Sequence, residues 1–222
     1  MDIILSSISQ GLLWSVMAIG VYLTFRILDI ADMTAEGSYP LGAAVCATGI
    51  VNGLNPFLAT FLAMIAGMGA GLISGLLHTK LKIPALLTGI VTLTGLYSIN
   101  LKILGKANVA LLKQETLVTQ LQDFGLAKTN AVLVIGTIFV LAVVGVLTLL
   151  LNTQIGLAIR STGDNIPMSE ANGINVDRMK IYGYMMSNGL IALCGALLTQ
   201  NNGYADLNSG TGTIVIGLAS VI

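Results

Sequence analysis

Long uncharged stretches alternate with short polar segments along most of the chain. A helix rising about 1.5 Å per residue needs about 20 apolar residues to cross a hydrocarbon core of roughly 30 Å. The pattern therefore predicts an all-α, polytopic membrane helical bundle. The stretches long enough to span are residues 3–25, 56–77, 83–101, 131–151 and 181–200; 37–54 is marginal because glycines, Pro40 and Asn52 interrupt it, and 211–222 is too short.

Composition supports a membrane location, because only 9% of the 222 residues are charged while 55% are hydrophobic. Basic residues in short loops mark the cytoplasmic side. If all the stretches cross, one set of loops is basic and is predicted to be cytoplasmic, which places the N-terminus and loop 102–130 outside; if 37–54 does not cross, the early topology changes. The chain is therefore predicted to cross a cell membrane several times; the family resemblance described below implies the bacterial cell membrane. The basic residues in these loops are Arg26, Lys80, Lys82, Arg160, Arg178 and Lys180.

The two ends of the chain carry their own expectations. Met1-Asp2 lacks the basic start and small-residue cleavage site of a secretory signal, so the first span is expected to be retained. A dozen apolar residues at the end cannot span. We expect residues 1–222 to form a single transmembrane domain that is truncated at its C-terminus.

The sequence lacks the common motifs for nucleotide hydrolysis and metal-assisted catalysis. It contains no phosphate-binding loop of the type G-x-x-x-x-G-K-[ST], no H-E-x-x-H and no cysteine pair at zinc spacing. Cys46 and Cys194 each lie inside a predicted span and are interpreted as packing residues. We expect a protein that is not an enzyme and holds no cofactor or metal of its own.

The hydrophilic segment 156–180 lies between two predicted spans and has the features of a short helix. Asp164 or Asn165 can cap its start, Pro167 is tolerated in its first turn, and Gly173 supplies a left-handed stop. Asn175 can then cap the next span. Because a free two-turn helix is marginal in water, this helix is predicted to need a docking surface; an ordinary, well-capped loop is the alternative.

Two runs of residues carry a family resemblance. The first resembles the cytoplasmic coupling loop of permease subunits of bacterial ABC importers, of the branched-chain amino acid and ribose permease type; it consists of Arg160, Asp164, Ser169-Glu170-Ala171, Gly173-Ile174-Asn175 and Arg178. The second, residues 25–38 leading into 41–44, is similar to a branch linked with tryptophan-like or tyrosine-like substrates. The resemblance covers essentially the whole chain.

The resemblance implies a function and a set of partners. The chain would be the membrane subunit of an importer that moves a small solute inward, an amino acid with an aromatic or branched side chain. Separate ATPase subunits would bind ATP and Mg, a solute-binding protein outside the membrane would deliver the solute, and a second permease copy would complete a homodimer; no nucleic acid is involved. The residues implied in ATPase coupling are Arg160, Asp164, Ser169, Glu170, Ala171, Asn172, Gly173 and Ile174, with Asn172 replacing the second alanine of the Glu-Ala-Ala signature.

Two similar tripeptides suggest an internal repeat. Ala31-Asp32-Met33 and Ala205-Asp206-Leu207 each precede a glycine-broken apolar stretch, and on the topology above the two stretches enter from opposite sides. Transporters built from inverted repeats place broken helices at corresponding positions. The matches are short enough to arise by chance, which stays open as the alternative.

Small and polar residues inside the spans have packing and transport interpretations. Gly67, Gly71 and Gly75 recur on one helix face and predict close contact with another helix, in the same chain or in a second copy. The candidates for the substrate path are Thr92, Thr94, Ser98 and Asn188, although such residues also hydrogen-bond between helices or to their own backbone. The acidic cluster of Asp29, Asp32 and Glu36 is interpreted as an interfacial cap.

Two other functions compete with the importer. A secondary transporter or channel would work without an ATPase, but ion-coupled transporters depend on ionisable residues inside the membrane, and no predicted span carries one in its middle. A membrane enzyme would need a convergent set of acids, bases or metal ligands, which the sequence does not offer.

Overall fold

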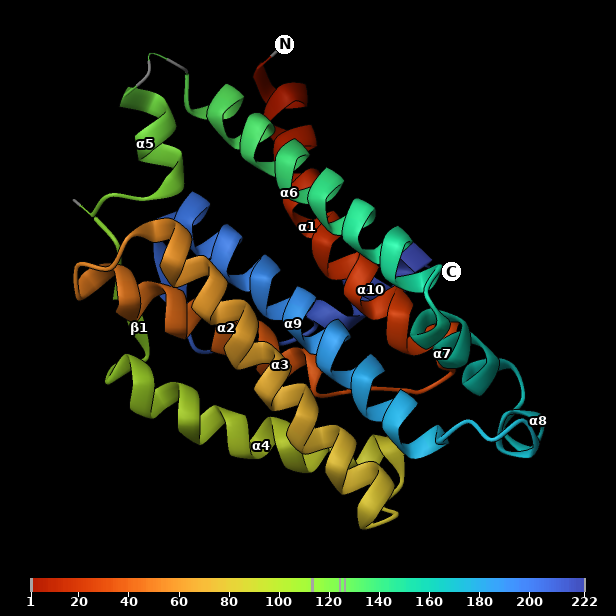
Figure 1. Cartoon of the computed structure of the whole chain (residues 1–222). Coiled ribbons are helices and arrows are strands. Elements are labelled where there is room, and N and C mark those ends of the chain that lie inside the picture. Colours follow the sequence, from red (N-terminus) through yellow and green to blue (C-terminus); the bar gives the residue numbers. More distant parts are fainter. Residues whose placement is uncertain (1, 113, 124, 126, 222) are drawn as a thin grey trace.

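The computed structural model describes residues 2–112, 114–123, 125 and 127–221. Long helices lie side by side in one bundle, and a short two-stranded ribbon lies at one end (Figure 1). The all-α fold is therefore confirmed. In chain order the elements are α1 (Asp2–Tyr22), the π-helix η1 (Leu23–Ile27), α2 (Ala35–Val51), α3 (Pro56–Lys80), α4 (Ala85–Leu104), β1 (Asn108–Ala110), α5 (Leu117–Asp123), α6 (Lys128–Leu151), α7 (Gln154–Asp164), α8 (Ile166–Ala171), α9 (Val176–Asn202), β2 (Tyr204–Asp206) and α10 (Thr213–Val221).

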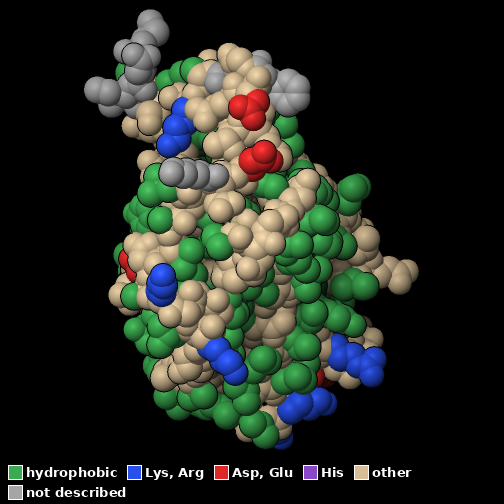
Figure 2. Space-filling view, turned by 90° about the vertical axis from the view of Figure 1, so that its left-hand side faces the viewer, with side chains coloured by type: hydrophobic (Ala, Val, Ile, Leu, Met, Phe, Trp, Pro, Cys, Tyr) green, Lys and Arg blue, Asp and Glu red, His purple; other side chains and the backbone are tan. Residues whose placement is uncertain are grey.

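Five helices of the described chain are long and apolar enough to cross a membrane, and they correspond to the five full spans expected from the sequence. They are the continuous helix of α1 and η1, then α3, α4, α6 and α9. Leu141 and Leu149 of α6 are 66% and 73% exposed, which suits a surface that faces lipid. Figure 2 shows hydrophobic side chains from top to bottom of the visible face, mixed with backbone and uncharged polar groups, and few charged side chains.

The marginal stretch forms α2, which is too short to span and is enclosed by other helices. Its 17 residues cover about 26 Å. Residues 28–34 complete the crossing as irregular chain, which runs inward from the end of η1 to the start of α2 (Figure 1). Asp29 has a φ of 53°, a left-handed conformation that breaks the preceding helix and that aspartate adopts more readily than most residues. Irregular backbone at this depth is tolerated because protein surrounds it.

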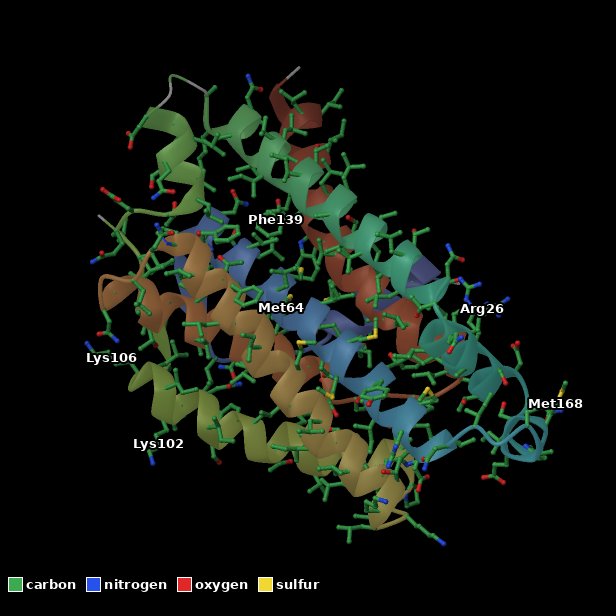
Figure 3. All side chains as sticks on the ribbon, in the orientation of Figure 1. Arg26, Met64, Lys102, Lys106, Phe139 and Met168 are labelled. Carbon is green, nitrogen blue, oxygen red and sulfur yellow. The ribbon has the colours of Figure 1, made fainter. Side chains whose placement is uncertain are left out.

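The two ends of the bundle differ in structure and in charge. α7 and α8 lie at the end where η1, α3 and α6 finish and α9 begins, and we call this the α7–α8 end (Figure 1). The strands β1 and β2 pair at the opposite, ribbon end, with Val109 opposite Ala205. Arg26 lies at the α7–α8 end, whereas Lys102 and Lys106 lie at the ribbon end (Figure 3). The α7–α8 end also carries Lys80 and Lys82 at the end of α3, Arg160 of α7, and Arg178 and Lys180 of α9, so the positive-inside rule predicts that this end is cytoplasmic.

The glycines of α3 pack against α9 of the same chain. A methyl group added at Gly71 would overlap the carbonyl oxygen of Tyr184, and one added at Gly67 would overlap Ala192. At Gly75 it would lie 3.0 Å from Cα of Ile181. The sequence left open whether these glycines contact a helix of the same chain or of a second copy, and the structure shows the contact within the chain. Lacking side chains, these glycines let the two backbones approach closely, which strengthens helix packing in lipid.

Both cysteines are buried and unlinked, as predicted for packing residues. The thiol of Cys194 donates to the carbonyl oxygen of Leu13 over 3.3 Å, which joins α9 to α1. Cys46 accepts a hydrogen bond of 3.3 Å from Nε2 of Gln200, which joins α2 to α9.

Candidate functional site

The short helix α8 has the caps that the sequence predicts. The side chain of Asn165, the second of the two predicted caps, accepts a 3.0 Å hydrogen bond from the backbone N–H of Met168. Pro167 lies in the first turn, and Gly173 adopts a φ of 78° just beyond the helix end. Asn175 caps α9 by accepting a 3.1 Å bond from the N–H of Arg178. Each end of α8 is therefore fixed by residues within this segment.

The sequence analysis missed α7, which precedes α8 as a separate helix. Thr153 caps its start by accepting a hydrogen bond from the N–H of Gly156. Ile159 is buried and Thr162 beside it is also covered, so one face of α7 packs on the bundle. Gly163 packs so closely on Ile27 that a methyl group there would overlap the Ile27 carbonyl oxygen. The sequence signal that could have predicted α7 was Thr153, a residue type that caps helices, followed by an amphipathic pattern.

α8 projects from the bundle with apolar side chains exposed. Met168 is 63% exposed and Ile166 is 40% exposed. Figure 3 shows Met168 directed away from the rest of the molecule. So short a helix is stabilised mainly by tertiary contacts, and these two side chains are left uncovered by the described residues of the chain.

The residues predicted for coupling fall into two groups. Ser169 is fully buried: its hydroxyl contacts that of Ser161 and donates to the carbonyl oxygen of Asn165 over 2.9 Å. This side chain fixes α8 to α7. Ile174 is half-buried, and its N–H donates to the carbonyl of Ser169. The remaining members are exposed and available to a partner; they are Arg160, Asp164, Glu170, Ala171, Asn172 and Gly173.

A buried polar cluster surrounds the interruption before α2. Asp32 is only 1% exposed, and its carboxylate accepts hydrogen bonds from Nδ2 of Asn188 at 2.7 Å and from the N–H of Thr34 at 2.9 Å. Ser38 donates to Oδ1 of Asn188 at 2.6 Å, and the hydroxyls of Thr34 and Ser74 lie 2.7 Å apart. The interpretation of Asp32 as an interfacial cap is therefore wrong in its location, because the interruption carries this carboxylate into the bundle. Asp29 is exposed, as expected at an interface.

A second interruption precedes α10 and uses the same turn. Asp206 accepts a 3.1 Å bond from the N–H of Asn208, just as Asp32 accepts one from Thr34 two residues on. Residues 207–212 then run inward from the ribbon end, whereas 28–34 run inward from the other end (Figure 1). The two tripeptides thus share one hydrogen-bonded turn and lead into segments of opposite direction, which is the arrangement that an inverted repeat predicts.

The segment 207–212 meets the first turns of α2, directly after the first interruption. The N–H of Gly212 donates to the Glu36 carboxylate over 3.0 Å. Gly210 packs against the backbone of α2, where a methyl group would overlap the Glu36 carbonyl oxygen and lie 2.7 Å from Cδ of Pro40. Pro40 has no N–H to donate to the Glu36 carbonyl four residues earlier, which weakens the helix at this contact.

A cavity of about 400 Å³ opens at this meeting point, and α4 forms its other wall. Such a volume lies within the range of small-molecule sites. Its lining is Glu36, Gly37, Pro40, Leu93, Thr94, Tyr97, Ser98, Asn100, Leu207, Asn208, Gly210 and Thr211.

The structure separates the residues predicted for the substrate path. Thr94 and Ser98 line the cavity, and the Thr94 hydroxyl also donates to the carbonyl of Ile90 over 2.8 Å. Thr92 is buried in α4. Asn188 belongs to the Asp32 cluster and does not line the cavity. The sequence analysis passed over Glu36 as a lining residue, although its position before Gly37 and Pro40 in a broken helix was a usable signal.

The described residues form no cluster of histidine, cysteine or acidic side chains that could hold a metal ion.

Comparison with known proteins agrees with this architecture. The family described as the permease component of branched-chain amino acid transport systems matches residues 3–222. A tyrosine transport system permease protein of Clostridioides difficile is 44% identical over 219 residues, which cover 99% of this chain and 72% of the relative. An uncharacterized protein of Rickettsia prowazekii is 35% identical over 222 residues, 100% of this chain and 76% of the relative.

A more distant relative matches only part of the chain. The protein of Methanocaldococcus jannaschii named as a branched-chain amino acid transport permease, LivH, is 29% identical over 77 residues, which cover 34% of this chain and 24% of the relative. No solved structure matches the chain.

Proposed function

Because the chain belongs to the family of permease components of branched-chain amino acid transport systems, we propose that it is the membrane-spanning subunit of an ATP-driven importer. The solute is an amino acid with an aromatic or branched side chain, in keeping with the transport systems after which two relatives are named. A solute-binding protein delivers it outside the membrane, and a second permease copy completes the path. The multi-pass membrane location is confirmed by the family and by the five apolar helices.

The observation that carries the ATPase coupling is the surface of α8. This helix is capped at both ends, fixed to α7 by Ser169, and exposes Met168 and Ile166 beside the charged Glu170. In this proposal the surface fits a groove on a separate ATPase subunit, which binds ATP and Mg. Closure of the ATPase pair then moves α7 and α8, and through α9 it moves the bundle.

The buried Asp32 bears on the rival function. An ionisable group inside the membrane is the mark of an ion-coupled transporter. Asp32, however, already accepts hydrogen bonds from Asn188 and Thr34, so its position has a structural explanation. We therefore retain the ATP-driven importer.

Co-purification and a charge reversal test the proposal. The tagged protein is extracted gently with its partners, and a stoichiometric ATPase subunit is expected in the purified complex. Glu170→Arg is expected to release that subunit and to abolish amino-acid-stimulated ATP hydrolysis. Glu115→Arg, which makes the same change on the exposed loop at the ribbon end, should leave both unchanged. Amino-acid transport by the permease alone in liposomes without ATP would overturn the proposal in favour of a secondary transporter or channel.

A further inference from the structure

The cavity between α2, α4 and residues 207–211 presents hydrogen-bond acceptors that its own surroundings leave unused. Asn100 is 1% exposed; its Nδ2 donates to the carbonyl of Gly37 over 3.2 Å, but no described residue donates to its Oδ1. Buried acceptors without a donor are uncommon and costly, so this one calls for an explanation. A hydrogen-bond donor on a bound ligand would pair with this oxygen of Asn100.

Glu36 adds negative charge to the same cavity. Its carboxylate is partly exposed and accepts one hydrogen bond, from the N–H of Gly212. No basic side chain in the described parts of the chain pairs with it. Lys102 and Lys106 at the ribbon end point away from the bundle (Figure 3). The carboxylate is thus free to pair with a cationic ligand.

The backbone beside Glu36 supplies further acceptor character. The Glu36 carbonyl cannot receive the usual helical bond from residue 40, because that residue is Pro40. The carboxylate, this carbonyl and Oδ1 of Asn100 together favour a group that carries positive charge and several N–H donors. Apolar side chains of Leu93 and Tyr97 form the α4 wall of the same cavity.

We propose that this cavity binds the α-ammonium group of the transported amino acid, with Glu36 as its charge partner and Asn100 as a further acceptor. The amino acid's apolar side chain lies against Leu93 and Tyr97. The inference rests on the proposed function for the identity of the solute, but it names a site within the permease itself. Selection then occurs twice, once in the binding protein and once in this cavity between α2, α4 and residues 207–211.

Protection from chemical labelling tests the site in the full chain without the ATPase. Ser98→Cys places a thiol on the cavity wall, while the natural Cys46 and Cys194 are buried. In nanodiscs, L-phenylalanine and L-leucine are expected to slow labelling of this thiol by an uncharged maleimide at least threefold. N-acetyl-L-phenylalanine, which lacks the cation, should not slow it at the same concentration. Leu112→Cys, 80% exposed and outside the cavity, serves as the labelling control.

Removing the charge of Glu36 is the second test of the site. Glu36→Gln keeps an oxygen that can accept from Gly212, so the fold is expected to survive, and the labelling rate without ligand checks this. The concentration of L-phenylalanine that gives half protection should rise about tenfold or more, the scale of one charged hydrogen bond. Glu115→Gln is the matched control and should leave that concentration unchanged.

The outcomes separate the site from the importer function. Equal protection by the N-acetyl compound, no protection by either amino acid, or equal half-protection in the two glutamine variants would overturn the site. ATP-driven uptake by the complete complex in proteoliposomes is measured in parallel. ATP-driven uptake without protection of the thiol from labelling would contradict only the proposed binding site. Protection of the thiol without ATP-dependent uptake would support the binding site and contradict the importer function.

Discussion

The carboxylate of Asp32 accepts a 2.7 Å hydrogen bond from the side-chain amide of Asn188, across 156 residues of sequence. The same amide group accepts from Ser38 through its oxygen and donates to the carbonyl of Tyr184 through its nitrogen. One side chain of α9 therefore holds both the irregular segment before α2 and the first turns of α2. Because the side chains of Asp32, Ser38 and Asn188 are all buried, these hydrogen bonds are costly to break.

Removing the Asn188 amide should destabilise the bundle. In Asn188→Leu the Asp32 carboxylate loses its side-chain donor and Ser38 its acceptor, and we expect a loss of about 3 kcal/mol or more in the free energy of unfolding. Thermal unfolding in detergent micelles measures the change. Asn152→Leu, at an exposed site after α6, is the control and should change stability little. Equal stability of the two variants would show that the Asp32 contact is energetically unimportant.

Two glycines of α3 should respond in opposite ways to the same substitution. Gly71→Ala is expected to cost about 1 to 3 kcal/mol, because the new methyl group overlaps the Tyr184 carbonyl oxygen and pushes α3 from α9. Gly69→Ala meets nothing within 4 Å and should be neutral or slightly stabilising, since alanine favours the helix. The comparison is made by thermal unfolding of both proteins, and a loss in Gly69→Ala as large as in Gly71→Ala would contradict the packing account.

Ser161 and Ser169 should act as a pair. Either Ser→Ala change removes the hydroxyl contact that joins α7 to α8, so each single variant should lower amino-acid-stimulated ATP hydrolysis by the complex. The double variant should be little worse than Ser169→Ala alone, because both changes break the same contact and Ser169→Ala also removes the bond to Asn165. Fully additive losses would mean that the serines act separately. Ser220→Ala on α10, whose hydroxyl bonds only within its own helix, is the control.

The ribbon register can be tested by cross-linking. Ala110 and Tyr204 lie directly opposite each other, so Ala110→Cys with Tyr204→Cys should form a disulfide under mild oxidation. A shift of two residues, Ala110→Cys with Asp206→Cys, should cross-link far less. Gel mobility after cleavage of the chain between β1 and β2 reports the bond, because only the disulfide then holds the two fragments together. Efficient cross-linking of the shifted pair would contradict the register.

Local features of the sequence were sufficient for the long helices and for the ends of α8, although not for α7. Uncharged length identified α3, α4, α6 and α9, because lipid tolerates few charges over a whole span. Capping chemistry located α8 within a few residues, since Asn165, Pro167 and Gly173 act on the backbone next to them. The glycine spacing of α3 likewise marked a packing face, although only the structure shows that α9 is its partner.

The positions of Asp32 and Glu36 depended on tertiary structure. Both residues belong to a short acidic run that looks like the polar end of a span, and no local pattern states how deep the chain goes after a break. Asp32 is buried because Asn188, far along the sequence, supplies its donor; Glu36 borders a cavity because residues 207–212 arrive from the opposite end. The sequence by itself determined which segments are helical and apolar, since those properties depend on neighbouring residues. Only the tertiary structure decided where the broken segments meet, because that depends on contacts between residues more than 150 positions apart.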